Sequence, residues 1–187
     1  MNLFPEQINL INDVLSSIED KSATEELKVI WGRHSGKSQV IKELDTKCNM
    51  MVFSTSAARD RKEYPNSDVF EYSMSPGDIT NHIKHLARFS KVPELIVLED
   101  FDWCGLNGRE VTWVMTALRE VCTEEKIPTI LMLTRYNKPS ITEDLFGTEG
   151  ACVKKATWEV NPNITKEMIA NAFCLHEAKA SRDFACQ

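Results

Sequence analysis

The sequence has no Cys-x-x-Cys pair, no internal repeat and no low-complexity segment. Its six cysteines are scattered singly, which argues against a zinc site because such sites draw ligands from closely spaced pairs. No apolar run approaches the roughly 18 residues that a membrane-spanning helix needs. The N-terminus also lacks the basic and apolar regions of a signal peptide. We therefore expect reduced thiols, no membrane partner and a cytoplasmic location.

The sequence also lacks an excess of basic residues, since 22 Lys and Arg against 28 Asp and Glu give a net charge of −6. This balance argues against a basic surface coat, so any nucleic acid would bind through a local basic patch. With 187 residues the chain is long enough for one buried core and hardly for two. We expect a single domain, divided into an N-terminal helix and linker (1–25), a core (26–162) and a C-terminal helix and tail (163–187).

The most informative stretch reads Lys-Val-Ile-Trp-Gly-Arg-His-Ser-Gly-Lys-Ser and spans residues 28–38. An apolar run ends in a glycine-containing turn, and Gly36-Lys37-Ser38 opens a predicted helix. Backbone N–H groups and a helix N-terminus can face an anion there, a lysine can reach the outer phosphates, and a hydroxyl can sit on Mg²⁺. The alternative is an ordinary turn between a strand and a helix. The candidate phosphate-binding residues are Gly32, Arg33, His34, Ser35, Gly36, Lys37, Ser38 and Gln39.

This loop departs from the usual pattern at its first glycine. Four residues normally separate the two glycines, but only three lie between Gly32 and Gly36, and Trp31 stands in the usual glycine position. Either the loop is one residue tighter, or Trp31 adopts a backbone conformation that is usually left to glycine.

A second informative stretch is the apolar run 95–98, which is followed by Glu99 and Asp100. Such a run suits a strand buried on both faces of a parallel sheet, and ligands bind at the carboxyl ends of such strands. Unpaired carboxylates would be costly to bury there, which favours a cation or water. We expect Ser38, Glu99 and Asp100 to form the metal site, although which carboxylate holds the metal and which polarises water stays open. A salt-bridged strand end is the alternative.

Polar residues also end the apolar run 129–133, where Thr134, Arg135 and Asn137 follow. A polar residue at this position can sense a γ-phosphate if its strand lies between the loop strand and the acidic strand. Arg135 is also a candidate arginine finger, acting on a neighbouring subunit. An ordinary basic strand end is an equally good interpretation.

Two further segments have both a structural and a functional interpretation. The charged run 59–63 is either a solvated loop or helix face, or a set of bases near the substrate or a neighbouring subunit, since loops after strands often carry function. Gln7 lies at the start of a predicted helix ahead of the loop, and that arrangement resembles helicases that read adenine with a glutamine. We favour a solvated helix face for Gln7.

Apolar periodicity predicts strands that alternate with helices, which indicates a three-layer α/β/α fold with a mostly parallel central sheet. The C-terminal tail 177–187 is polar and is expected to be loosely held. The expected helices cover 5–19, 37–47, 79–89, 107–126 and a segment capped by Asn163 or Thr165, and the expected strands cover 27–31, 50–53, 68–72, 95–98, 129–133 and 156–160.

Residues 31–38 resemble the Walker A motif, and residues 95–100 resemble Walker B. The whole stretch 27–160 is similar to the P-loop NTPases in which an additional strand separates the two motifs, such as RecA-like motors, AAA+ proteins and viral packaging ATPases. The resemblance implies ATP and Mg²⁺ as cofactors and a homo-oligomer that acts in the cytoplasm, or as a viral protein in the host cell. It implies Lys37, Glu99, Asp100, Thr134 and Arg135 as catalytic residues.

Three functions follow from this resemblance. The first is an ATPase that drives translocation, packaging or remodelling of nucleic acid. The second, favoured by the altered motifs and by the acidic balance of the chain, is a nucleotide-switched module that hydrolyses slowly and binds a partner protein. A small-molecule kinase is the third, although no arginine-rich lid is evident. The absence of an Asn/Thr-Lys-x-Asp guanine signature favours ATP over GTP.

Overall fold

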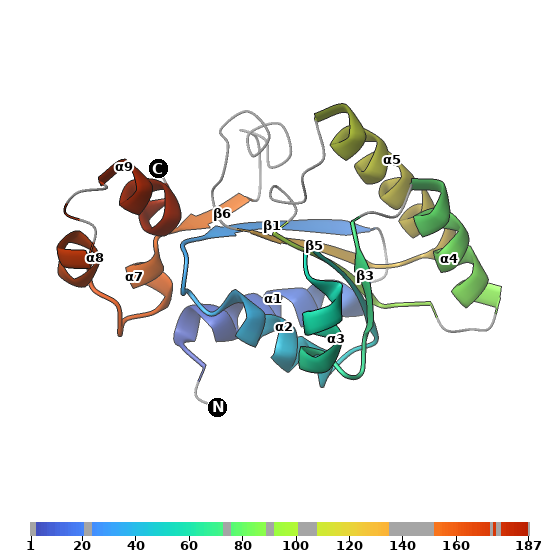
Figure 1. The fold of residues 1–187 in the computed structure, drawn as a ribbon. Helices are drawn as coiled ribbons and strands as arrows, with labels where there is room; N and C mark the ends of the chain where they lie inside the picture. The colour runs from blue at the N-terminus through green and yellow to red at the C-terminus, as the bar shows by residue number, and fades with distance from the viewer. Residues whose placement is uncertain are drawn as a thin grey trace.

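A computed structural model of the chain, shown in Figure 1, describes residues 3–20, 24–72, 76–88, 92–100, 108–134, 152–172, 174 and 177–186. Arg135, Asn137 and the segment 139–150 lie outside these residues. The elements are α1 (Pro5–Glu19), β1 (Glu25–Trp31), α2 (Lys37–Asp45), β2 (Met50–Ser54), α3 (Ala57–Glu63), β3 (Asp68–Glu71), α4 (Pro76–Arg88), β4 (Leu95–Glu99), α5 (Gly108–Glu125), β5 (Thr129–Thr134), β6 (Cys152–Lys155), α7 (Thr157–Val160), α8 (Lys166–Ala172), α9 (Glu177–Ala180) and a π-helical turn, η2 (Ser181–Ala185).

The strands form one sheet in the order β3-β2-β4-β5-β1-β6, and every neighbouring pair is parallel. Strands β2, β4 and β5 are buried along their whole length, as their apolar runs predict for strands covered on both faces. The predicted three-layer α/β/α fold is therefore confirmed. Because β5 lies between β1 and β4, the end of β5 lies beside the end of β1, which leads into the Gly-Lys-Ser loop, and beside the end of β4, which carries Glu99.

Helices α1, α2 and α3 cover one face of the sheet, and α4 and α5 cover the other (Figure 1). One core cluster includes Val14 of α1 and Ile41 of α2, packed with the strand residues that face them. The opposite cluster joins Ile83 of α4 and Leu118 of α5 to the other face. These two apolar layers fix the sheet, so the polar ends of its strands are held by a rigid frame.

The predicted strand 156–160 is wrong. The strand at this edge is β6, which pairs with β1 from Cys152 to Lys155, and the chain then turns into the short helix α7. Glu159 explains the early end of the strand, because its carboxylate accepts a hydrogen bond from the Ala156 backbone N–H at 2.6 Å and caps the turn.

The C-terminal elements α7, α8 and α9 gather beside β6 (Figure 1). Of the two predicted caps of the last long helix, Thr165 is the one used, because its hydroxyl oxygen accepts the Met168 N–H at 3.2 Å. The expectation of a loosely held tail is wrong, since Asp183, Phe184 and Cys186 are buried. None of the described helices is long and apolar enough to cross a membrane.

Candidate functional site

A cavity of about 420 Å³ opens where the loop after β1, the end of β4 and the start of α3 meet. Because parallel strands present their carboxyl ends at one edge, segments more than sixty residues apart in the sequence meet here. The loop residues Gly32 and Ser35 and the strand end Thr134 are not among the described lining residues. The described lining residues are Arg33, His34, Gly36, Lys37, Ser38, Gln39, Arg59, Glu99 and Asp100.

The backbone conformation of the loop shows how it folds with Trp31 in the usual glycine position. Trp31 is the last residue of β1, and its φ is not positive. The left-handed conformations fall instead on His34, with φ 62°, and on Gly36, with φ 85°. The alternative in which Trp31 takes a glycine conformation is therefore wrong, and the loop turns through the three residues between its two glycines.

Helix α1 holds the second half of the loop through Gln7. The Gln7 amide Nε2 donates a hydrogen bond to the Ser35 carbonyl at 2.8 Å, while its Oε1 accepts the Phe4 N–H at 2.9 Å. Gln7 is only 2% exposed, so the favoured prediction of a solvated helix face is wrong. A Cβ at Gly36 would collide with the Gln7 amide, and both this closeness and the positive φ require glycine there.

The C-terminal segment holds the first half of the loop. The Thr157 hydroxyl donates to the Arg33 carbonyl at 2.7 Å, and Asn161 Nδ2 donates to the His34 carbonyl at 3.0 Å. The Arg33 N–H donates to the Asp183 carbonyl at 2.5 Å. We call Thr157, Asn161 and Asp183 the C-terminal clamp.

The clamp also explains Gly32. A Cβ at this position would overlap the Thr157 hydroxyl and the Phe184 carbonyl, so a glycine is needed for close packing although its φ is not positive. Sequence reasoning missed the clamp. Its bonds mostly join side chains to backbone carbonyls across more than 120 residues, and such contacts leave no motif in the sequence.

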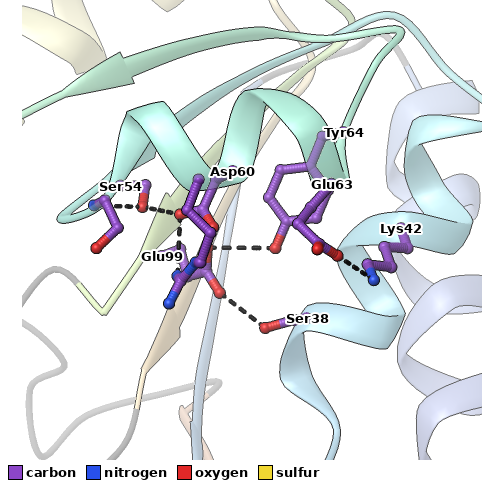
Figure 2. Close-up of polar contacts among 9 residues, drawn as sticks. Ser38, Lys42, Ser54, Asp60, Glu63, Tyr64 and Glu99 are labelled. Atoms are coloured by element: carbon purple, nitrogen blue, oxygen red, sulfur yellow. Dashed lines mark hydrogen bonds and ion pairs between the residues drawn. The ribbon is translucent and has the colours of Figure 1, made fainter.

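Lys37 and Ser38 occupy the first turn of α2, directly beside the cavity. Lys37 Nζ donates to the carbonyls of Trp31 and Gly32 at 3.2 and 3.4 Å, so the ammonium lies over the loop. The Ser38 hydroxyl donates to Glu99 Oε1 at 3.1 Å. This bond joins the two predicted motifs directly, as Figure 2 shows.

Glu99 lies in a largely closed environment and is 6% exposed. The Tyr64 hydroxyl donates to its Oε2 at 3.3 Å, and the Tyr72 hydroxyl donates to its backbone carbonyl at 2.8 Å. Burial raises the pKa of Glu99 to about 7, and the negative charges of Asp60 and Asp100 contribute in the same direction. The bond from Ser38 and the positive charge of Arg59 partly offset this rise in pKa.

A second buried carboxylate, that of Asp60 on α3, lies next to Glu99 (Figure 2). It accepts a hydrogen bond from the Ser54 hydroxyl, and Arg59 pairs with it through Nε at 2.6 Å and Nη2 at 3.2 Å. In the charged run 59–63, Arg61 and Lys62 are exposed, as the solvated-surface interpretation predicts. Arg59 lines the cavity, and the interpretation that places these bases near a substrate stays a prediction.

Asp100 follows β4 in a left-handed conformation, with φ 50°. Its backbone N–H donates to the Leu133 carbonyl of β5 at 3.0 Å. Its Oδ1 is buried and has no hydrogen-bond partner within the described part of the chain. An unpartnered carboxylate oxygen beside a cavity favours a site that receives a cation or a water molecule.

The donor set fits Mg²⁺. The Ser38 hydroxyl and the Glu99 carboxylate are hydrogen-bonded to each other, and both are oxygen ligands of the kind that Mg²⁺ prefers. No group of three or more His, Cys, Asp or Glu side chains within metal-binding reach occurs among the described residues. This matches magnesium sites that take one or two protein ligands and complete their shell with phosphate and water.

No protein-family model matches the sequence, and neither does any curated protein. Among solved structures, the chain is similar to the crystal structure of a double mutant of Pif1 helicase from Bacteroides, with a TM-score of 0.48 and 14% identity. The similarity covers 89% of this chain and 44% of that one, so this chain spans less than half the length of that protein. The parallel strand order and the Gly-Lys-Ser loop after β1 agree with the fold class predicted from the sequence.

Proposed function

We propose that this chain binds ATP with Mg²⁺ and hydrolyses it to drive a nucleic-acid transaction as a homo-oligomer. One observation carries the proposal: Lys37 and Ser38 of α2 line a single cavity together with Glu99 and Asp100 at the end of β4. Phosphoryl transfer is catalysed mostly by positioning and charge stabilisation, so a small set of oriented residues is sufficient.

In this proposal Lys37 moves its ammonium from the loop carbonyls to the β- and γ-phosphates, which offer it a stronger acceptor. The backbone N–H groups around Gly36 face the phosphates at the N-terminus of α2. Ser38 and Glu99 would hold Mg²⁺, which when bound neutralises phosphate charge. The hydrogen bond between these two residues supports this assignment and leaves the water-orienting role to Asp100.

The chemical step uses one water molecule. Asp100, whose Oδ1 has no hydrogen-bond partner among the described residues, orients this water towards the γ-phosphorus. The water oxygen forms a new bond to that phosphorus as the bond to the β–γ bridging oxygen breaks. The electron pair of the broken bond leaves with ADP, and the proton of the water passes to Asp100.

The end of β5 carries the candidates Thr134 and Arg135. Thr134 ends a strand in the required position between β1 and β4, but its side chain is fully buried and it is not among the described residues that line the cavity. We therefore assign the γ-phosphate contact across subunits to Arg135, in line with the resemblance to RecA-like motors. Arg135 lies outside the described residues.

A steady-state ATPase assay with and without DNA or RNA tests the nucleic-acid part of the proposal, which rests on the resemblance to RecA-like motors. Stimulation of turnover by either polymer is expected. Turnover that is unchanged by DNA and RNA would indicate an ATPase that does not act on nucleic acid. Phosphorylation of a small-molecule acceptor would support the kinase alternative.

A nucleotide-switched module is the second candidate, because of the environment of Glu99. Both its carboxylate oxygens accept hydrogen bonds, and its pKa near 7 leaves part of the population neutral at physiological pH. Both features reduce the capacity of Glu99 to hold a metal for fast turnover. Tight binding of Mg²⁺-ATP with turnover slower than about one per hour would favour the switch over the motor.

A further inference from the structure

Three basic side chains line the described part of the cavity, and they differ in what holds them. Lys37 lies over the loop carbonyls, and Arg33 forms an ion pair with Asp183 of the C-terminal clamp, at 3.8 Å. Arg59 is different because it enters the cavity from α3. Its side chain is 66% exposed, although its guanidinium is paired with Asp60.

The anchor of Arg59 is built from buried groups. Asp60 is 1% exposed and binds the guanidinium at two points, through Nε and Nη2. Ser54, at the end of β2, donates to the same carboxylate and also accepts the Ser56 N–H at 3.0 Å. A two-point pair fixes the plane of a guanidinium, which a single contact cannot do.

The helix that carries Arg59 is itself fixed to the elements of the nucleotide site. Lys42 of α2 pairs with Glu63 at the end of α3, and Tyr64 directly after α3 donates to Glu99 (Figure 2). The position of Arg59 is therefore set relative to both Ser38 and Glu99. The charges of Arg59 and Glu99 also influence each other's ionisation, which agrees with their closeness in the cavity.

We propose, building on the function proposed above, that Arg59 is a catalytic residue that contacts the γ-phosphate of the nucleotide bound by its own chain. Asp60 and Ser54 are the positioning residues that aim its guanidinium. During hydrolysis the new bond forms between the water oxygen and the γ-phosphorus, and the bond to the bridging oxygen breaks. Arg59 neutralises the charge that spreads over the transferring phosphoryl oxygens and takes up no proton, because its guanidinium stays protonated.

The competing explanation is that Arg59 only neutralises Asp60. That role needs a positive charge at Asp60 and nothing beyond it, whereas a catalytic role needs the planar guanidinium in the cavity. Arg59→Lys separates the two, because lysine keeps the charge but loses the two-point geometry. A third possibility, in which Arg59 binds the phosphates of nucleic acid, is separated by turnover measured without nucleic acid.

The test compares the wild type with R59A, R59K and the double variant R59A/D60N, which removes the buried charge together with its partner. Lys62→Ala is the matched control, since Lys62 is an exposed base on the same helix. Affinity for Mg²⁺-ADP and for Mg²⁺-ADP-aluminium fluoride, which imitates the transferring phosphoryl group, is measured with turnover and thermal unfolding.

We expect each Arg59 variant to bind Mg²⁺-ADP within about threefold of the wild type. Each should bind the aluminium fluoride complex about 100-fold more weakly and lose turnover to a similar extent. The control should match the wild type. Unfolding curves identify a variant that does not fold. If R59A does not fold, R59K and R59A/D60N still test the proposal.

Four results would overturn the inference. R59K or R59A/D60N could bind the aluminium fluoride complex like the wild type, or turnover without nucleic acid could survive while only its stimulation is lost. Wild type that binds no nucleotide would overturn the proposed function itself, and the role of Arg59 with it. Wild type that binds and hydrolyses ATP while the Arg59 variants do the same would overturn only the role of Arg59.

Discussion

At the scale of single residues, the site depends on a few groups whose environments are unusual. Glu99 is the clearest, because Ser38, Tyr64 and two neighbouring carboxylates surround it in a buried space. A carboxylate in such a place favours its neutral form unless a cation compensates. The site in the absence of nucleotide therefore carries an electrostatic cost that a bound cation would relieve.

This cost predicts how stability depends on pH. The pKa of Glu99 is about 7 in the folded chain against an ordinary 4.5, so between these values the folded state binds more protons than the unfolded state. The contribution of Glu99 to stability is therefore present at low pH and is lost as the pH rises through 7. One pKa unit corresponds to about 1.4 kcal/mol, so the full loss is about 3 kcal/mol.

Glu99→Gln removes the ionisation and should make the chain more stable than the wild type at pH 8, with little difference near pH 4.5. Chemical denaturation across this range, without nucleotide or metal, measures the difference. Glu71→Gln, at an exposed position at the end of β3, is the control and should show no such trend. A wild-type-to-E99Q difference that stays constant with pH would contradict the environment described for Glu99.

Gly36 gives a second prediction at this scale. Alanine at a φ of 85° costs roughly 1–2 kcal/mol, and its Cβ would push the Gln7 amide away from Ser35. We expect Gly36→Ala to unfold at a lower temperature and to bind nucleotide at least tenfold more weakly. Gly77→Ala, in the first turn of α4, should instead be neutral or slightly stabilising. Unchanged nucleotide affinity in Gly36→Ala would mean that the loop does not need this conformation.

At the scale of elements, two segments far from the loop in the sequence give it its shape. Helix α1 contributes Gln7 to the second half of the loop, and the C-terminal clamp contributes Thr157 and its neighbours to the first half. The loop after β1 is thus held by side chains from both the N-terminal helix and the C-terminal segment. The clamp bonds to the backbone of Arg33 and His34, whereas the proposed phosphate contacts lie around Gly36.

Thr157→Val tests the clamp with little change in volume, because valine keeps the shape of threonine and loses its hydroxyl. Loss of the bond to the Arg33 carbonyl should cost about 1 kcal/mol of stability and leave that carbonyl unpaired. We expect nucleotide affinity to fall about threefold to tenfold, as measured by calorimetry. Thr123→Val, whose hydroxyl bonds within α5, serves as the control. Equal affinities for the two variants would show that the clamp does not shape the site.

Much of the fold and of the site was predictable from the sequence, for a physical reason. The apolar runs at 95–98 and 129–133 have the length and continuity of buried parallel strands, and polar residues at their ends have to meet at one edge. The joining of Ser38 to Glu99 followed from that rule. The lining of the cavity by Lys37 and Asp100 followed from it as well.

The rest was not predictable because it depends on contacts that leave no periodicity. In the sequence Gln7 resembles any polar residue on an amphipathic helix. Only the structure shows that its amide bonds to the Ser35 carbonyl of the loop. Thr157 belongs to a segment of strand-like composition, and only the Glu159 cap and the end of β6 make it helical. Asp60 lies in a charged run that reads as solvent-exposed, although its pairing with Ser54 and Arg59 buries it.

At the scale of the whole molecule, two apolar layers hold a parallel sheet whose polar edge carries the cavity. A ligand that binds only the folded chain stabilises it, by about 2.7 kcal/mol at a concentration one hundred times its dissociation constant. For a chain of this size each kcal/mol raises the melting temperature by about 2–4 °C. Saturating Mg²⁺-ADP should therefore raise the melting temperature by about 5–10 °C.

The central claim is that the loop from Gly32 to Ser38 binds nucleotide phosphates, and titration calorimetry of Mg²⁺-ADP against wild type and Lys37→Ala tests it most directly. Lys42→Ala, on the same helix and paired with Glu63 away from the cavity, is the control. We predict one site per chain in the wild type and in the control, and at least thirtyfold weaker binding in Lys37→Ala. Equal affinity in Lys37→Ala and the wild type, or no binding by the wild type, would contradict the account.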